Sequence, residues 1–114
     1  DADTRAFLDI FGVTDGHTLV VLKKHGDTIL DYSSEEIGKL WTSVQKVAAA
    51  LEKAFHTKIL SIGINHGEPR GVHHLHVHLM PRYENDQGGI MQQLPTQKRS
   101  EEPSEVMKKI KKQL

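Results

Sequence analysis

The longest amphipathic pattern in the chain begins at residue 37. Its apolar residues recur every three or four positions, as on one face of a helix: Ile37, Leu40, Trp41, Val44, Val47, Ala48, Leu51 and Phe55. Just before this stripe, Ser33 and Glu36 have the spacing of a capping box, in which each side chain binds the backbone amide of the other residue. We therefore predict a helix from the capping box to about residue 55, with its apolar face packed on a sheet.

Shorter patterns predict strands on both sides of this helix. Residues 17–23 and 58–65 are rich in apolar and β-branched side chains, and residues 5–10 precede the first of these across a glycine-containing turn. Residues 73–80 form the fourth predicted strand, which Pro81 ends. Because residues 5–10 and 17–23 are joined so closely, they should form a hairpin, and hence an antiparallel sheet.

The C-terminal quarter has a different character. Residues 83–103 are polar and contain Gly88, Gly89 and Pro95, so we expect irregular structure there, followed by a short helix over residues 104–114. A length of 114 residues suits one domain. We predict a single α+β domain over residues 1–114, with a core at 1–86 and an irregular C-terminal extension at 87–114.

Composition narrows the possible partners. Fifteen basic and fifteen acidic residues give a formal net charge of zero, whereas proteins that bind nucleic-acid polymers usually carry a basic excess. A small anionic ligand remains compatible with this balance. No apolar run is long enough to span a membrane, and we expect no signal peptide. With no cysteine, disulfides and thiolate zinc sites are excluded, and we expect a cytoplasmic protein.

Histidine is the unusual residue type. The chain has eight histidines, and four of them fall within residues 73–78. Because side chains alternate faces along a strand, His74, His76 and His78 should share one face, and the apolar residues between them the other. Neighbouring rings on that face would lie roughly 6.5–7 Å apart, close enough for one phosphate group to contact two of them.

Such a row of imidazoles suits nucleophilic chemistry at phosphorus. A neutral ring attacks through one nitrogen if the other holds the proton, and a backbone carbonyl is the simplest acceptor to fix that tautomer. The flanking rings can donate to phosphoryl oxygens as charge develops. We expect His76, in the middle, to be the nucleophile.

Two other readings of the histidines stay open. They could be structural, although each buried ring would then need a partner for its polar nitrogens. They could also bind a metal, because His-x-His on a strand can direct two nitrogens to one ion, with His17 or His25 completing the set. A metal-dependent hydrolase is therefore an alternative function.

The segment from His74 to Met80 resembles the defining motif of the histidine triad (HIT) superfamily, in which three histidines alternate with apolar residues. Further segments that resemble the family, and its bacterial members in particular, occur in the expected order: 7–10, 16–21, 23–25, 64–67 and 81–83. The resemblance covers roughly residues 5–83. It implies a sheet of about five antiparallel strands in the full domain, with helices, and a homodimer in which the two sheets join.

The resemblance also implies an activity. Family members are nucleotide hydrolases or transferases that cleave a nucleoside 5′-monophosphoryl group through a covalent nucleotidyl-histidine intermediate. Adenosine phosphoramidates and dinucleoside polyphosphates are the implied substrates, and no cofactor is expected. By the same resemblance, His76 is the nucleophile, His78 contacts the phosphate and the leaving side, His74 supports the site, and His17 matches a fourth histidine that borders it.

Further residues are assigned to substrate binding by resemblance alone. Asp9 matches a carboxylate that binds the ribose hydroxyls, Ile10 an apolar contact to the base, and Asn65 an amide that approaches the phosphate. Gly71 and Val72 lie where the family has phosphate-binding residues.

The loop before the triad departs from the family pattern. Family members usually have Gly-Gln-Ser/Thr-Val there, whereas this chain has a shortened stretch from Arg70 to His73, without the glutamine or the hydroxyl. Arg70 or His73 could substitute. The departure leaves open a nucleotide-binding module with little catalysis.

Overall fold

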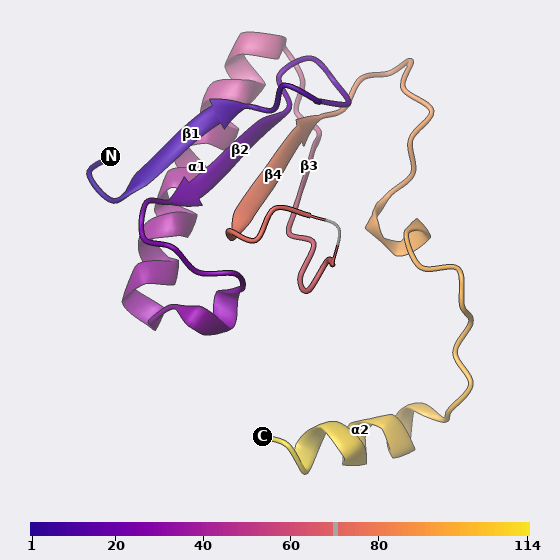
Figure 1. The fold of residues 1–114 in the computed structure, drawn as a ribbon. Helices are drawn as coiled ribbons and strands as arrows, with labels where there is room; N and C mark the ends of the chain where they lie inside the picture. Colours follow the sequence, from indigo (N-terminus) through magenta and orange to yellow (C-terminus); the bar gives the residue numbers. More distant parts are fainter. Residues whose placement is uncertain (70) are drawn as a thin grey trace.

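The computed structural model describes residues 1–69 and 71–114 (Figure 1). Arg70, which the sequence suggested as a substitute phosphate contact, lies outside the described residues. Four strands form one sheet: β1 (Thr4–Leu8), β2 (Thr18–Leu22), β3 (Leu60–Gly63) and β4 (His76–Pro81). Their order is β1-β2-β4-β3 and every neighbouring pair is antiparallel. The α+β fold class is confirmed, with four strands in the described residues against about five expected for the full domain.

One long helix covers one face of this sheet (Figure 1). Helix α1 (Ser34–Phe55) begins at the predicted capping box, where the Glu36 amide donates to Ser33 Oγ at 3.1 Å and the Ser33 amide donates to Glu36 Oε1 at 2.9 Å. The buried core lies between helix and sheet: Val20, Leu22, Leu40, Val44, Leu51, Leu75, Val77 and Leu79. Trp41 lies outside this core, with 40% of its surface exposed.

The predicted start of the fourth strand was wrong. Strand β4 begins at His76, so His74 precedes the strand, although the alternation of half-buried and buried residues already begins with His74 and Leu75. The ladder between β2 and β4 ends at the pair Val21–His76. Before this pair, the Leu75 amide donates to the Gly26 carbonyl at 2.8 Å, outside the ladder, because the chain after β2 has turned away.

The C-terminal part leaves the sheet as an extended segment (Figure 1). It contains two short elements, the 3-10 turn η2 (Met91–Gln93) and helix α2 (Pro103–Lys111). A third short element, η1 (Ile29–Asp31), precedes α1. In the described part of the chain, no helix has both the length and the apolar character needed to cross a bilayer.

Candidate active site

The face of β4 that α1 leaves uncovered carries two of the predicted histidines. Along this strand, His76, His78 and Met80 are half-buried, and the residues between them are buried in the core. The predicted alternation is therefore confirmed for His76 and His78. Their ring centroids lie 4.9 Å apart with the planes tilted by 64°, so one small group can contact both rings.

His76 is held in one tautomer by the backbone. Its Nδ1 lies 2.7 Å from the carbonyl oxygen of His74. A carbonyl oxygen can only accept, so Nδ1 carries the proton and Nε2 of the neutral ring keeps its lone pair. This arrangement, expected from the sequence as a chemical requirement, leaves Nε2 available for attack on an electrophile.

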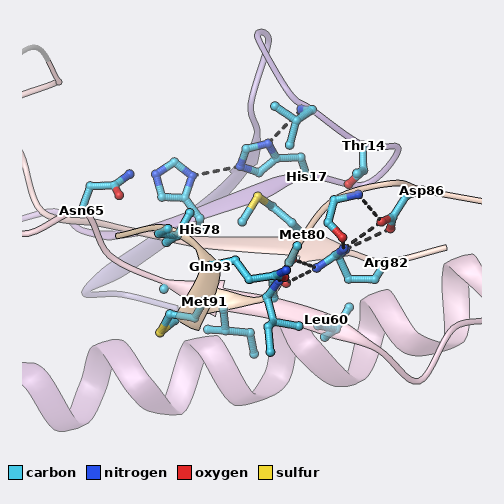
Figure 2. A pocket seen from close by; sticks show the side chains of 18 of the residues that line it. Thr14, His17, Leu60, Asn65, His78, Met80, Arg82, Asp86, Met91 and Gln93 are labelled. Atoms are coloured by element: carbon cyan, nitrogen blue, oxygen red, sulfur yellow. Dashed lines mark hydrogen bonds and ion pairs between the residues drawn. The ribbon is translucent and has the colours of Figure 1, made fainter. Parts of the chain in front are cut away.

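His78 pairs with a histidine that is distant in the sequence. His17, which immediately precedes β2 and is 5% exposed, brings Nε2 to 2.9 Å from His78 Nδ1. Figure 2 shows the two rings side by side along one wall of a pocket. Burial, the nearby His76 ring and the His17 ring lower the pKa of His78 from its ordinary value, so the neutral ring is favoured.

His74 occupies a separate position. Its Nε2 donates to the Leu22 carbonyl at 2.7 Å, and its ring meets the edge of the His25 ring at a centroid distance of 5.2 Å. The backbone carbonyl of His74, and not its ring, contacts His76. The prediction that all three rings project from one regular strand is therefore wrong for His74, which lies before β4 and whose ring contacts Leu22 and His25, although its half-burial is in phase with that of His76 and His78.

Asp9 and Ile10 follow the end of β1. Oδ1 of Asp9 accepts from the Phe11 amide at 2.9 Å, and its Oδ2 lies 3.7 Å from His17 Nε2. Thus one carboxylate oxygen stabilises the turn after β1, and the other faces the histidine pair. Ile10 is 87% exposed. It is not among the residues that line the pocket described below.

Asp9, His17 and His78 are also close enough to hold a metal ion, with one ligand atom from each lying within 4.8 Å of the others. However, the facing nitrogens of the two rings are already bonded to each other. An ion would have to replace the shared proton. Of the three side chains, only His17 and His78 are hydrogen-bonded to each other, and Asp9 Oδ2 lies 3.7 Å from His17 Nε2.

A pocket of about 1150 Å³ extends along the open face from this histidine pair (Figure 2). His17, His78 and Asn65 line it together with residues of β3 and of the segment after β4. His76 lies beside the pocket through its contact with His78. The structure therefore brings His17, His76, His78 and Asn65 to one region of the open face.

A clamp holds the segment that closes the pocket. The Arg82 guanidinium forms a two-pronged ion pair with Asp86, at 2.9 and 2.7 Å, and donates to the carbonyl oxygens of Gly88 and Gly89. This pairing and two backbone amides lower the pKa of Asp86 well below its ordinary range. The clamp positions Met91, whose side chain lies across Gly63 of β3.

The loop before the triad shows a different placement. Gly71 and Val72 are exposed, Val72 to 75%, and the Gly71 amide makes a long bond of 3.4 Å to the Glu68 carbonyl. Neither residue lines the pocket. The described structure does not bring them to the histidine pair.

Sequence reasoning missed several contributors to this region. The Val13 amide donates to His17 Nδ1 at 3.1 Å, and Met91 and Gln93 line the pocket. The role of a backbone amide cannot be recognised from the residue type. Gly12 is the sequence feature that indicates close packing of this loop on His17, because a Cβ atom there would lie 3.1 Å from His17 Cβ and 2.9 Å from the Asp9 carbonyl oxygen.

An antiparallel sheet covered on one face by a helix, with His74, His76 and His78 at the start of one central strand, is the arrangement expected of a histidine-triad protein. Residues 1–85 match the family model of the HIT domain, and the chain belongs to this family.

Relatives and solved structures agree with this assignment. A HIT-like protein of Saccharolobus solfataricus is 36% identical over 106 residues, which cover 91% of this chain and 76% of the relative. The bis(5′-nucleosyl)-tetraphosphatase [asymmetrical] of Schizosaccharomyces pombe is 36% identical over 83 residues, 71% of this chain and 46% of that protein. The crystal structure of a HIT family protein from Bacillus subtilis has a TM-score of 0.83 at 32% identity, covering all of this chain and 84% of the other. The chain thus spans less than half the length of the S. pombe enzyme.

Proposed function

We propose that this chain is a nucleotide hydrolase or transferase in which His76 Nε2 attacks the phosphorus of a nucleoside 5′-monophosphoryl group. The observation that carries the proposal is the 2.7 Å bond from His76 Nδ1 to the His74 carbonyl. It commits the ring proton to Nδ1 and leaves the Nε2 lone pair on the open face. A nearby hydrogen-bond acceptor also stabilises the positive charge that the ring acquires on attack.

The reaction proceeds in two balanced steps. First, a phosphorus–nitrogen bond forms to His76 Nε2 while the bond from phosphorus to the leaving oxygen or nitrogen breaks, and the leaving group takes up a proton. Then a water molecule, or another acceptor, attacks the same phosphorus and loses a proton. The phosphorus–nitrogen bond breaks, which releases the nucleoside monophosphate and restores the neutral ring.

Other residues bind the substrate in this proposal. His78, 4.9 Å from His76 between ring centroids, contacts the phosphoryl oxygens or the leaving group. Asn65, which lines the same pocket as His78, approaches the phosphate. Asp9 binds the ribose hydroxyls through its half-buried carboxylate, and Ile10 provides an exposed apolar contact to the base. Gly71 and Val72 reach the phosphate only if the loop moves toward the histidines.

Adenosine phosphoramidates and dinucleoside polyphosphates are the proposed substrates. The S. pombe relative is a bis(5′-nucleosyl)-tetraphosphatase, which supports the second class. The zero net charge also favours a small ligand over a polymer.

A substrate panel tests this function. Purified protein is assayed with adenosine and guanosine phosphoramidates and with diadenosine tri- and tetraphosphate, in parallel with His76→Ala. We expect turnover by the wild type and none by the variant, with adenosine monophosphate still bound in calorimetry. Turnover by His76→Ala at the wild-type rate would contradict the mechanism. Binding without turnover by the wild type would favour the nucleotide-binding module, and loss of turnover on chelation would favour a metal-dependent hydrolase.

We also propose that two copies associate through β3. This strand lies at one edge of the sheet and pairs only with β4 among the described strands. An edge strand presents unpaired backbone groups that a second copy can bind. Light scattering should give twice the mass of a single chain, and Ile62→Pro, which removes a backbone donor in β3, should shift the species toward the monomer. A wild type that stays monomeric at all concentrations would contradict the association.

A further inference from the structure

The His78 ring has one nitrogen bonded and one nitrogen without a partner. Its Nδ1 contacts His17 Nε2 at 2.9 Å. Its Nε2 is buried and has no hydrogen-bond partner among the described residues. A buried polar atom without a partner is costly, so it is a natural position for a group that binds a ligand. The tautomer of the ring decides whether Nε2 is an N–H donor or an acceptor with a lone pair.

The tautomer can be derived from the backbone inward. The Val13 amide can only donate, so His17 Nδ1, at 3.1 Å, must be the acceptor. A neutral His17 therefore carries its proton on Nε2 and donates it to His78 Nδ1. Neutral His78, which then accepts at Nδ1, must carry its own proton on Nε2. The unpartnered atom is thus an N–H donor.

The loop that supplies the Val13 amide is held on several sides. The Asp9 amide donates to the His17 carbonyl at 2.9 Å, and the Gly12 amide donates to the Asp9 carbonyl at 3.0 Å. The His17 amide donates to the Thr14 carbonyl at 3.1 Å. Since both ends of the loop and the histidine itself are tied together, the Val13 amide is fixed toward His17.

Asp9 does not compete for the shared proton. Its Oδ2 lies 3.7 Å from His17 Nε2, beyond hydrogen-bonding distance, whereas His78 Nδ1 lies at 2.9 Å. The Asp9 carboxylate therefore leaves the His17 Nε2 proton directed at His78 Nδ1. The relay therefore runs from the Val13 amide through His17 to His78.

We infer that His17 is a positioning residue that holds His78 as the Nε2–H tautomer, so that a proton and not a lone pair faces the phosphoryl group. The inference rests on the proposed function of His76. In the other tautomer, His78 would direct a lone pair at a negatively charged oxygen. That contact would be repulsive where the transition state needs a donor.

Two nearly isosteric substitutions of His17 separate this role from simple packing. In His17→Gln, the side-chain oxygen can accept from the Val13 amide and the NH₂ group can donate to His78 Nδ1, so the relay is kept. In His17→Glu, the carboxylate can only accept and would draw the His78 proton onto Nδ1. His17→Leu, which offers neither donor nor acceptor, replaces the Glu variant if that one does not fold. His56→Gln, at an exposed histidine, is the matched control.

The first measurement is ¹⁵N NMR of the histidine rings, which distinguishes protonated from unprotonated nitrogens and needs no turnover. We expect a protonated Nε2 and an unprotonated Nδ1 for His78 in the wild type, His17→Gln and His56→Gln. The Glu variant should reverse this pattern. A wild-type His78 with its proton on Nδ1 would overturn the inference, whatever the enzyme does.

The second measurement is steady-state kinetics with a nucleotide substrate. Loss of one transition-state donor typically lowers kcat by about 100-fold or more, so His17→Glu and His17→Leu should show a loss of this size with KM changed only a few-fold. His17→Gln should keep kcat within about tenfold of the wild type, as one neutral donor replaces another. Equal kcat in all three variants would also overturn the inference. Absence of turnover by the wild type would contradict the proposed function but not the tautomer of His78, which the NMR measurement determines independently.

Discussion

The buried face of β4, opposite His76 and His78, can be tested directly for its contribution to stability. Leu79 is fully buried between Thr18 of β2 and Ile62 of β3, on the face that meets α1. It follows His78 in the strand and points the other way. We predict that Leu79→Ala destabilises the fold strongly and weakens the support of His78.

The size of the effect follows from the atoms removed. The substitution deletes three buried carbons, worth about 0.8 kcal/mol each and therefore about 2.4 kcal/mol by transfer alone. The cavity left in a packed core adds to this, so the expected loss is about 3 kcal/mol, within the usual range of about 2–5 kcal/mol. With an unfolding entropy of about 2.1 cal/mol/K per residue, 114 residues give a fall in Tm of about 12 °C.

Urea and thermal unfolding followed by circular dichroism measure both quantities. Leu30→Ala is the control, because Leu30 is 80% exposed and its loss should change stability by less than about 0.5 kcal/mol. If the two variants lose equal stability, Leu79 is not in the core described here. The placement of His76 and His78 on the open face of the sheet would then be wrong as well.

Three further predictions follow from the structure. Ser33→Ala removes the cap of α1 and should lower the free energy of unfolding in urea by about 1 kcal/mol. An unchanged midpoint would show that the capping box does not stabilise the protein. Burial and the nearby histidine rings lower the pKa of His78 below its ordinary 6.5, so on acidification the unfolded chain is protonated at this residue before the folded chain. The free energy of unfolding should therefore fall as the pH drops below about 6.5. His78→Gln should reduce that pH dependence, and an unaltered profile would contradict the lowered pKa. Arg82→Lys replaces a planar fork that binds Asp86 with a single charge, so limited proteolysis should cut residues 86–94 faster than in the wild type, and equal cleavage rates would refute the clamp.

The sequence could predict the elements whose causes are local. The capping box at Ser33 and Glu36, with the apolar stripe after it, predicted α1 nearly to the residue. The period of two predicted the shared face of His76 and His78. These features depend on backbone geometry within one element, so no knowledge of the tertiary structure was needed.

Features that depend on two distant segments could not be predicted in the same way. The start of β4 is set by where β2 ends, and the turn after Leu22 removed His74 from the strand. The bond between His17 and His78 joins residues 61 positions apart, and the Val13 amide that orients it is a backbone group. Resemblance to the HIT family placed His17 at the border of the site, but only the coordinates show which atom it contacts.

The most direct test of the central claim is to locate the covalent intermediate. The protein is mixed with an adenosine phosphoramidate or diadenosine polyphosphate, quenched in alkali during turnover, digested, and analysed by mass spectrometry. We predict one adenylyl group on the peptide that contains residues 74–78, assigned by fragmentation to His76 and absent from His76→Ala, as the covalent mechanism requires. An adenylyl group on any other residue, or substrate cleaved at the wild-type rate by the variant, would contradict it.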